Sequence, residues 1–192
     1  MRIACVLSAA ELDGNAADLV IFPEGVCVSE LEAAASAQPE AVIVGAIQCG
    51  PYSRGVVWHK GMDHIDYLKV GTDGRTQGSG NCDQLPVAHF PTFSVAVLVC
   101  MDIDNPHFSA TVREALRASP NDVKVLCIPA DMGDYWLQGD KLPFPTLYAG
   151  MYVALCNSTV THDSRCKSFV ADRDGKKVRI QSATEPIYVD VL

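Results

Sequence analysis

The sequence predicts an α/β fold in which two sheets pack against each other and helices lie outside them. Strand-like runs recur along the whole chain, and many are apolar without alternation, such as Val42-Ile43-Val44 and Val95 to Val99. Uninterrupted apolar runs are typical of strands that are covered on both faces. Helical segments are fewer and shorter, so two packed sheets account for the pattern better than one open sheet.

The predicted strands are spread over the whole sequence. They run over Arg2 to Leu7, Leu19 to Phe22, Ala41 to Gln48, Gly55 to His59, His64 to Val70, Val95 to Cys100, Lys124 to Ile128, Tyr152 to Cys156, Ser168 to Asp172, Lys177 to Gln181 and Ile187 to Leu192. Hairpin turns are predicted at Lys60-Gly61-Met62-Asp63 and at Asp174-Gly175. The runs Leu19 to Pro23 and Val125 to Pro129 both end in proline, which suggests two related halves.

Three short helices are predicted, two of them from capping signals. Ser29 and Glu32 form a capping box at the start of the first helix. Asn105 supplies an N-cap at the start of the second, followed by a proline at the first helical position. The three helices are expected from Glu30 to Ala37, from Pro106 to about Ala118 and from about Pro145 to Met151.

Size and composition indicate one ordinary globular domain over residues 1–192, with 48% hydrophobic and 20% charged residues. A net charge of −8 and a pI near 5.0 argue against nucleic acid or an anionic membrane as the main partner. No apolar run approaches the roughly 20 residues that cross a bilayer. Residues 1–10 are too short for a signal peptide, so we expect a cytoplasmic protein.

The chain has 8 cysteines, and no two of them form a C-x-x-C pair. Cys5, Cys100, Cys127 and Cys156 all fall in apolar runs, where free thiols behave as small hydrophobic side chains. We therefore expect reduced thiols rather than disulfides. Without a C-x-x-C pair and with scattered histidines, no zinc site is predicted.

A glutamate, a lysine and a cysteine each follow a predicted buried strand. They are Glu24, Lys69 and Cys100, in that order along the chain. An ionisable residue placed directly after an apolar run lies at the rim of a sheet. A carboxylate, an ammonium and a thiol gathered there would form a nucleophile with its own base and its own stabiliser of negative charge.

Each of the three residues has a chemical role and an ordinary structural alternative. Cys100 lies on a strand-to-helix turn, where backbone N–H groups and a helix dipole favour a thiolate; the alternative is simple packing. Glu24 follows a rigid proline and is placed to act as general base; the alternative is a solvated loop carboxylate. Lys69 could stabilise an oxyanion; the alternative is a side chain that points to solvent.

Two loops are candidates for the walls of this site. The polar, glycine-rich stretch 71–84 lies between Lys69 and Cys100, and we expect a site wall or a lid there. Asp131, Tyr135 and Trp136 follow the strand that should flank the nucleophile, so we expect them to line the substrate site. The alternative for these three is an exposed aromatic loop.

Six motifs in this order resemble those of the nitrilase, or carbon–nitrogen hydrolase, superfamily, and they span essentially the whole chain. The motifs are Val20-Ile21-Phe22-Pro23-Glu24, Tyr67-Leu68-Lys69-Val70, Val97-Leu98-Val99-Cys100-Met101-Asp102, Val125-Leu126-Cys127-Ile128-Pro129-Ala130, Tyr152-Val153-Ala154-Leu155-Cys156-Asn157 and Ser168-Phe169-Val170-Ala171-Asp172-Arg173-Asp174-Gly175. The resemblance implies an α-β-β-α sandwich of two mixed sheets and hydrolysis of amides or nitriles without metal or cofactor. It also implies that Cys100 forms a thioester, that Glu24 is the base, and that Lys69 and the Met101 backbone N–H hold the oxyanion.

The sequence departs from the family pattern at three places. No glutamate lies between Gly71 and Val99, where many members carry one. After the nucleophile, where members often carry arginine, an aromatic residue, proline and glutamate, this sequence has Asp104, Asn105, Pro106 and His107. The link from Leu7 to Asp18 is too short for the usual long first helix, so we expect a reduced outer helix layer and apolar surface that a partner subunit could cover.

The leading hypothesis is a small cytoplasmic amidase that forms a homo-oligomer and uses no cofactor. Its partner would be a small amide or nitrile. The alternative is a nitrilase-fold protein that has lost efficient catalysis and serves as a binding or assembly subunit. A third reading is a redox-active thiol protein with Cys82 as the resolving cysteine of Cys100.

Overall fold

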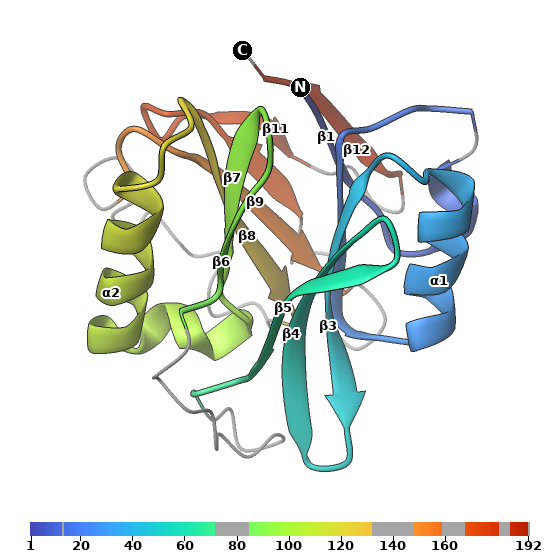
Figure 1. The fold of residues 1–192 in the computed structure, drawn as a ribbon, viewed down its shortest axis with the longest axis horizontal. Coiled ribbons are helices and arrows are strands. Elements are labelled where there is room, and N and C mark those ends of the chain that lie inside the picture. The colour runs from blue at the N-terminus through green and yellow to red at the C-terminus, as the bar shows by residue number, and fades with distance from the viewer. Residues whose placement is uncertain (13, 72–84, 132–147, 159–167, 181–184, 192) are drawn as a thin grey trace.

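The chain folds into two six-stranded sheets that pack face to face in the computed structural model (Figure 1). The structure describes residues 1–12, 14–71, 85–131, 148–158, 168–180 and 185–191. One α-helix lies outside each sheet, so the described layers run helix, sheet, sheet, helix. This architecture confirms the predicted α-β-β-α sandwich.

Sheet A contains the strands from both ends of the sequence. Its spatial order is β12 (Ile187–Asp190), β1 (Arg2–Cys5), β2 (Leu19–Val26), β3 (Val42–Cys49), β4 (Tyr52–His59) and β5 (Met62–Leu68). The central pairs β1–β2 and β2–β3 are parallel, and the outer pairs are antiparallel. The predicted hairpin at Lys60-Gly61 joins β4 to β5, with His59 opposite Met62.

Sheet B repeats the same topology with the second half of the chain. Its order is β6 (Val87–His89), β7 (Phe93–Val97), β8 (Val123–Ala130), β9 (Tyr152–Asn157), β10 (Phe169–Ala171) and β11 (Lys177–Ile180). Here β7–β8 and β8–β9 are parallel, while the outer pairs are antiparallel. The middle strands β2 and β8 pack against each other, and both carry the proline noted in the sequence.

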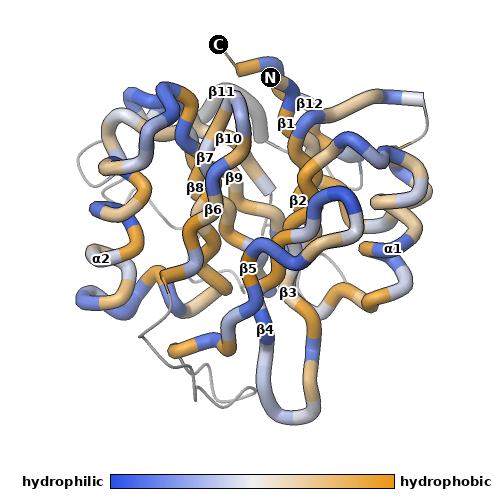
Figure 2. The backbone as a smooth tube through the Cα atoms, in the orientation of Figure 1, coloured by the Kyte–Doolittle hydropathy of each residue, from blue (hydrophilic) through white to orange (hydrophobic). Residues whose placement is uncertain are grey.

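The core lies between the sheets because successive residues on each strand alternate between two buried faces. On β2, Leu19 and Ile21 belong to the large cluster between the sheets, whereas Val20 and Phe22 belong to a smaller cluster on the outer face of sheet A. Figure 2 shows the resulting apolar centre of the molecule. Burial on both faces explains why these strands are apolar at every position.

The two α-helices cover the outer faces of the sheets. α1 (Val28–Ala37) buries Leu31 and Ala34 against sheet A, and α2 (Pro106–Arg117) packs on β7 and β8. Shorter 3₁₀ helices follow β1 and β7: η1 (Ala9–Leu12) and η2 (Cys100–Asp104). By the matching topology of the sheets, η1 occupies the connection that corresponds to α2.

The capping predictions had different outcomes. Asn105 caps α2 as predicted, because its side chain accepts a hydrogen bond from the backbone N–H of Phe108 at 3.1 Å. The capping box at Ser29 is wrong: α1 begins at Val28, with Cys27 as an N-cap that makes no side-chain bond. β2 runs on to Val26, so the chain turns directly into the helix and Ser29 lies inside it.

Other element boundaries differ from the predictions by a few residues. β2 continues past Glu24, and β7 ends at Val97, so Cys100 starts η2 instead of closing a strand. The short strand β6 was missed. Of the third predicted helix, residues 148–151 form turns, and 145–147 lie outside the described residues.

The short link between β1 and β2 leaves a reduced helix layer, as predicted. The expected exposed apolar surface, however, is not found among the described residues. Leu12 of η1 is only 4% exposed and packs in the cluster on the outer face of sheet A. The short helix η1 therefore covers apolar surface that a longer helix would otherwise cover. The large exposed apolar side chains of the described residues are Val28 at the start of α1, Met62 at the start of β5 and Leu85 just before β6.

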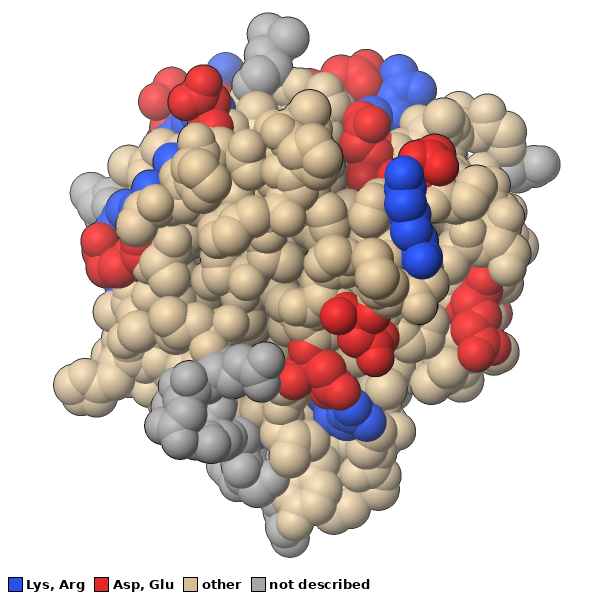
Figure 3. All heavy atoms as spheres, viewed as in Figure 1, with Lys and Arg blue, Asp and Glu red and all other residues tan. Residues whose placement is uncertain are grey.

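On the face in Figure 3, acidic and basic side chains are interspersed around a wide uncharged area. Within the described part of the chain, no helix has the length and apolarity to span a bilayer.

Gly55 should be intolerant of any side chain. A Cβ built at this position of β4 would lie 2.3 Å from the ring of Tyr67, its partner across the β4–β5 pair. We therefore expect Gly55→Ala to lower the free energy of unfolding by about 3 kcal/mol, the upper range for overpacking a core. Urea denaturation measures this cost. In a Tyr67→Leu background the same change should cost clearly less; an equal cost in both backgrounds would contradict the steric explanation.

Candidate active site

Glu24 reaches the space between the sheets because β2 is irregular at this point. The register with β3 shifts on both sides of Glu24, between Ile21 and Glu24 and again before Val26. A bulge of this kind interrupts the alternation of a strand and re-aims a side chain. Glu24 is 7% exposed, so a carboxylate that the sequence places at a sheet rim is in fact buried.

Lys69 lies directly after β5 and forms a buried ion pair with Glu24. Its Nζ is 2.9 Å from Glu24 Oε1 and 3.2 Å from Oε2. The Lys69 side chain has no exposed surface, and that of Glu24 is 5% exposed. Removing two charges from water costs several kcal/mol for each ion, so the pair is stable only if both groups are well satisfied. The predicted alternatives, a solvated glutamate and a solvent-facing lysine, are therefore wrong.

Ser53, which the sequence analysis did not identify, connects the two members of this pair. Its hydroxyl donates to Glu24 Oε1 at 2.6 Å, and its carbonyl accepts the backbone N–H of Lys69 at 2.8 Å. Ser53 is fully buried on β4, between the strands that carry the two charges. A lone serine near a hairpin carries no sequence signal for such a role.

Cys100 joins these two groups from the opposite sheet. The negative charge of Glu24 and the positive charge of Lys69 both act on its thiol. The backbone of Asp131, after β8, makes a hydrogen bond with the same thiol. The three residues named from the sequence thus come together in one place, although they lie far apart along the chain.

The thiol of Cys100 is protonated in the resting site. Burial and the negative charge of Glu24 raise its pKa to about 12, and these effects outweigh Lys69 and the Asp131 backbone, which lower it. Cys100 is 2% exposed, and this desolvation is the largest cause. Any nucleophilic reaction of this sulfur needs a base.

The segment after Cys100 is tied to the segment around Lys69. Asp102 is fully buried, and its Oδ1 accepts the backbone N–H groups of Val70 at 2.8 Å and Gly71 at 2.6 Å. Its Oδ2 accepts the hydroxyl of Tyr67 at 2.9 Å. Burial raises the pKa of Asp102 to about 6, whereas these hydrogen bonds lower it. Asp102 and Tyr67 both fall in motifs quoted above, but neither was predicted to have a role.

The remaining predicted residues are only partly described. Met101 follows Cys100 in η2 and is half-buried, and Asp131 contacts Cys100 through its backbone. Tyr135, Trp136, Cys82 and most of the predicted loop lid (72–84) lie outside the described residues. In the described part of the chain, no group of three or more histidine, cysteine or acidic side chains could hold a metal ion.

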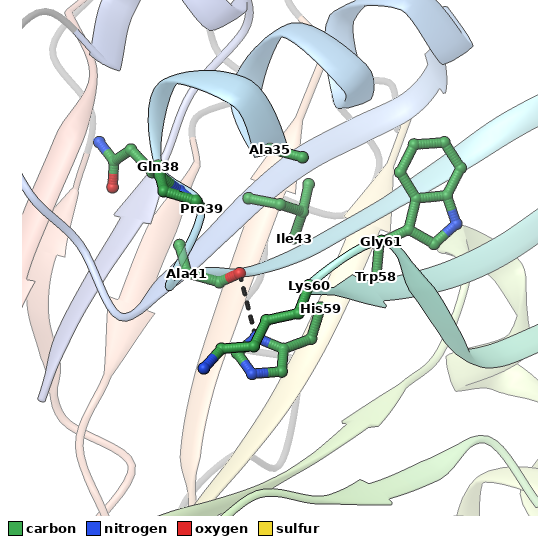
Figure 4. A pocket seen from close by; sticks show the side chains of 9 residues that line it. All are labelled: Ala35, Gln38, Pro39, Ala41, Ile43, Trp58, His59, Lys60 and Gly61. Carbon is green, nitrogen blue, oxygen red and sulfur yellow. Dashed lines mark hydrogen bonds between the residues drawn. The ribbon is translucent and has the colours of Figure 1, made fainter.

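A separate hollow of about 170 Å³ lies on the outer face of sheet A, beside α1 (Figure 4). Its walls include Trp58 and Ile43, and His59 Nδ1 lies 3.4 Å from the Ala41 carbonyl oxygen. None of the three candidate residues lines it. It is therefore distinct from the site between the sheets.

Comparisons with known proteins identify the fold. No protein-family model matches this sequence, and a search of curated proteins finds no match. Among solved structures, a variant of the amidase from Nesterenkonia sp. AN1 shares 16% identity over 100% of this chain and 93% of its own, with a TM-score of 0.74. A cysteine-to-serine variant of that amidase, from the nitrilase superfamily, shares 16% identity over 100% of this chain and 92% of its own, with a TM-score of 0.75. Nit3 of Saccharomyces cerevisiae, a member of branch 10 of that superfamily, shares 15% identity over 98% of this chain and 89% of its own, with a TM-score of 0.71.

These likenesses show that the chain has the nitrilase-superfamily fold over essentially its whole length. The resemblance that six short motifs suggested is thus confirmed at the level of the fold. At a sequence identity of 15 to 16%, the comparison shows the fold and does not identify an activity.

Removing the Glu24 charge should destabilise the protein strongly. Glu24→Gln leaves the buried Lys69 ammonium without its carboxylate, and breaking a buried pair typically costs about 3–5 kcal/mol. Urea denaturation at neutral pH measures the loss. Glu40→Gln is the matched control, because Glu40 pairs with Lys60 on the surface, with side-chain exposures of 81% and 52%. That change should cost less than about 1 kcal/mol; equal costs would contradict the buried pair.

The rate of alkylation of Cys100 should rise with pH without reaching a plateau between pH 7 and pH 10. Thiolate is the reactive form, so below a pKa of about 12 its fraction grows about tenfold for each pH unit. We expect the rate of iodoacetamide labelling at Cys100, followed by peptide mass spectrometry, to keep rising from pH 7 to pH 10. The same cysteine in urea-unfolded protein should level off near the ordinary value of about 8.5. A plateau below pH 9 in the folded protein is the contrary result.

Proposed function

We propose that this protein is a carbon–nitrogen hydrolase that cleaves the C–N bond of a small amide through a thioester on Cys100. The observation that carries the proposal is the buried pair of Glu24 and Lys69, 2.9 Å apart, with the thiol of Cys100 acted on by both. A base, a nucleophile and a cation close together are the parts that thiol acyl transfer needs.

The first half of the reaction forms the acyl-enzyme. Glu24 accepts the thiol proton while the Cys100 sulfur attacks the amide carbonyl carbon, because the thiol is protonated at rest. The carbonyl oxygen becomes negative and is stabilised by the Lys69 ammonium and the backbone N–H of Met101. The C–N bond then breaks, the leaving amine takes the proton from Glu24, and a thioester remains on Cys100.

The second half releases the acid. Glu24 accepts a proton from a water molecule, and the resulting hydroxide attacks the thioester carbon. The same two donors hold the second oxyanion. When the C–S bond breaks, the sulfur recovers a proton from Glu24 and the carboxylic acid leaves. The cycle is complete with the protein's own groups and one water, so the proposal includes no metal or cofactor.

Small amides are the substrate class that we propose. The solved amidase of Nesterenkonia with the same fold has been seen with acrylamide added at its active-site cysteine, and with the acetamide moiety of fluoroacetamide bound there. Nitriles remain the other predicted class. We also retain as proposals a single domain over 1–192, a cytoplasmic location, a homo-oligomer, and a substrate wall formed by Asp131, Tyr135 and Trp136.

A second candidate is a nitrilase-fold subunit for binding or assembly with little catalytic activity. The observation that favours it is the state of Cys100, whose sulfur is buried and whose pKa is raised to about 12. The two candidates differ in one measurement. The subunit would leave a panel of small amides and nitriles intact, whereas the hydrolase would release ammonia from at least one member.

Cys100→Ala should abolish turnover and keep the fold. With acetamide, propionamide and acrylamide as substrates, we expect ammonia release to fall by about a thousandfold or more, as for the loss of other catalytic nucleophiles. The native protein, quenched in acid during turnover, should carry an acyl group on Cys100 in its mass spectrum. Cys27→Ala is the control, because Cys27 is an exposed free thiol. Hydrolysis that persists in the Cys100 variant would falsify the proposal.

A further inference from the structure

The turn that carries the nucleophile is held in a strained conformation. Cys100 has a φ of +48°, in the left-handed region that residues other than glycine rarely adopt. A conformation of this kind costs about 1–3 kcal/mol and persists only where the surroundings enforce it. Some feature of the fold must therefore hold the backbone on both sides of Cys100.

Tyr67 holds the residue before the nucleophile. The backbone N–H of Val99 donates to the Tyr67 hydroxyl at 2.7 Å, and that hydroxyl donates in turn to Asp102 at 2.9 Å. Burial and the Asp102 charge raise the pKa of Tyr67 well above its usual value, so the hydroxyl keeps its proton. The absence of a side chain at Gly55 makes room for the ring of Tyr67.

Asp102 holds the residues after the nucleophile against the lysine segment. Its carboxylate binds the two backbone N–H groups that follow Lys69, those of Val70 and Gly71. The two backbones are in direct contact, since a Cβ on Gly71 would lie 2.9 Å from the carbonyl oxygen of Met101. A buried carboxylate is costly unless it is fully hydrogen-bonded, so this arrangement is specific.

We infer that Asp102 and Tyr67 form a positioning clamp that fixes the Met101 backbone and Lys69 relative to the Cys100 sulfur. Neither residue need touch substrate. The clamp joins the end of β5 to η2, so the two groups proposed to hold the oxyanion keep one fixed separation. This inference rests on the proposed hydrolase function for its catalytic consequence. Its structural part stands on the hydrogen bonds alone.

Two variants remove parts of the clamp with little change in shape. In Asp102→Asn, an oxygen is replaced by an NH₂ group, so Val70 and Gly71 can keep their acceptor while the Tyr67 hydroxyl loses its own. In Tyr67→Phe, the backbone N–H of Val99 and one oxygen of Asp102 both lose a partner. Asp104→Asn is the matched control, because Asp104 lies in the same short helix and is exposed.

We expect both clamp variants to lower kcat for amide hydrolysis by about ten- to hundredfold, because a shift of about 1 Å in a reacting group has this effect. KM should change less than about threefold, and Asp104→Asn should behave as the native protein. The Tyr67 hydrogen bond lowers the pKa of Asp102, so Tyr67→Phe should also move the acidic limb of kcat/KM to higher pH. A purely structural role would leave that limb in place.

Failure of the clamp and failure of the hydrolase proposal give different results. If the native protein turns over an amide and both variants match Asp104→Asn, the clamp is wrong and the hydrolase stands. If the native protein hydrolyses nothing, amide hydrogen exchange decides. Slow exchange at Val99 in native protein, at least tenfold faster in Tyr67→Phe but not in Asp104→Asn, supports the clamp; fast exchange in native protein overturns it. If Asp102→Asn does not fold, Tyr67→Phe alone decides by the same criteria.

Discussion

The buried ion pair of Glu24 and Lys69 constrains the rest of the structure. Two full charges that are almost completely removed from water are tolerated only where each has close partners, so the strands that carry them cannot shift independently. β2 and β5 are separated by β3 and β4 in sheet A, and Ser53 of β4 spans the gap between them. The irregular register of β2 at Glu24 belongs to the same arrangement, because it aims the carboxylate at the lysine.

The pairing of the two sheets brings the third group to this pair. β2 lies in the middle of sheet A and packs against β8 in the middle of sheet B. Cys100 follows β7, the neighbour of β8, so its thiol comes under the influence of the Glu24 charge on β2. Because Cys100 follows a strand of one sheet and Glu24 lies on a strand of the other, the proposed site depends on how the two sheets are packed.

The sequence was informative where a residue's role follows from its immediate neighbours. Apolar runs located most strands, and Asn105 before a proline located the start of α2. The three candidate groups were found because each directly follows an apolar run. What the sequence could not show depends on residues distant in the chain. Ser53 has no local signature, and the pKa of Cys100 is set by burial and by Glu24, which no spacing rule reports. The failed capping box at Ser29 shows the converse, since β2 determined where α1 begins.

Ser53 also bears on how such a protein could change over evolutionary time. One residue holds the side chain of the acid and the main chain of the lysine, so a movement of β4 would displace both together. A mutation that moves β4 would therefore disturb Glu24 and Lys69 at the same time. For the proposed hydrolase, changes of substrate preference are therefore expected to accumulate in segments contributed by sheet B, because mutations there leave Ser53 and the Glu24–Lys69 pair in place.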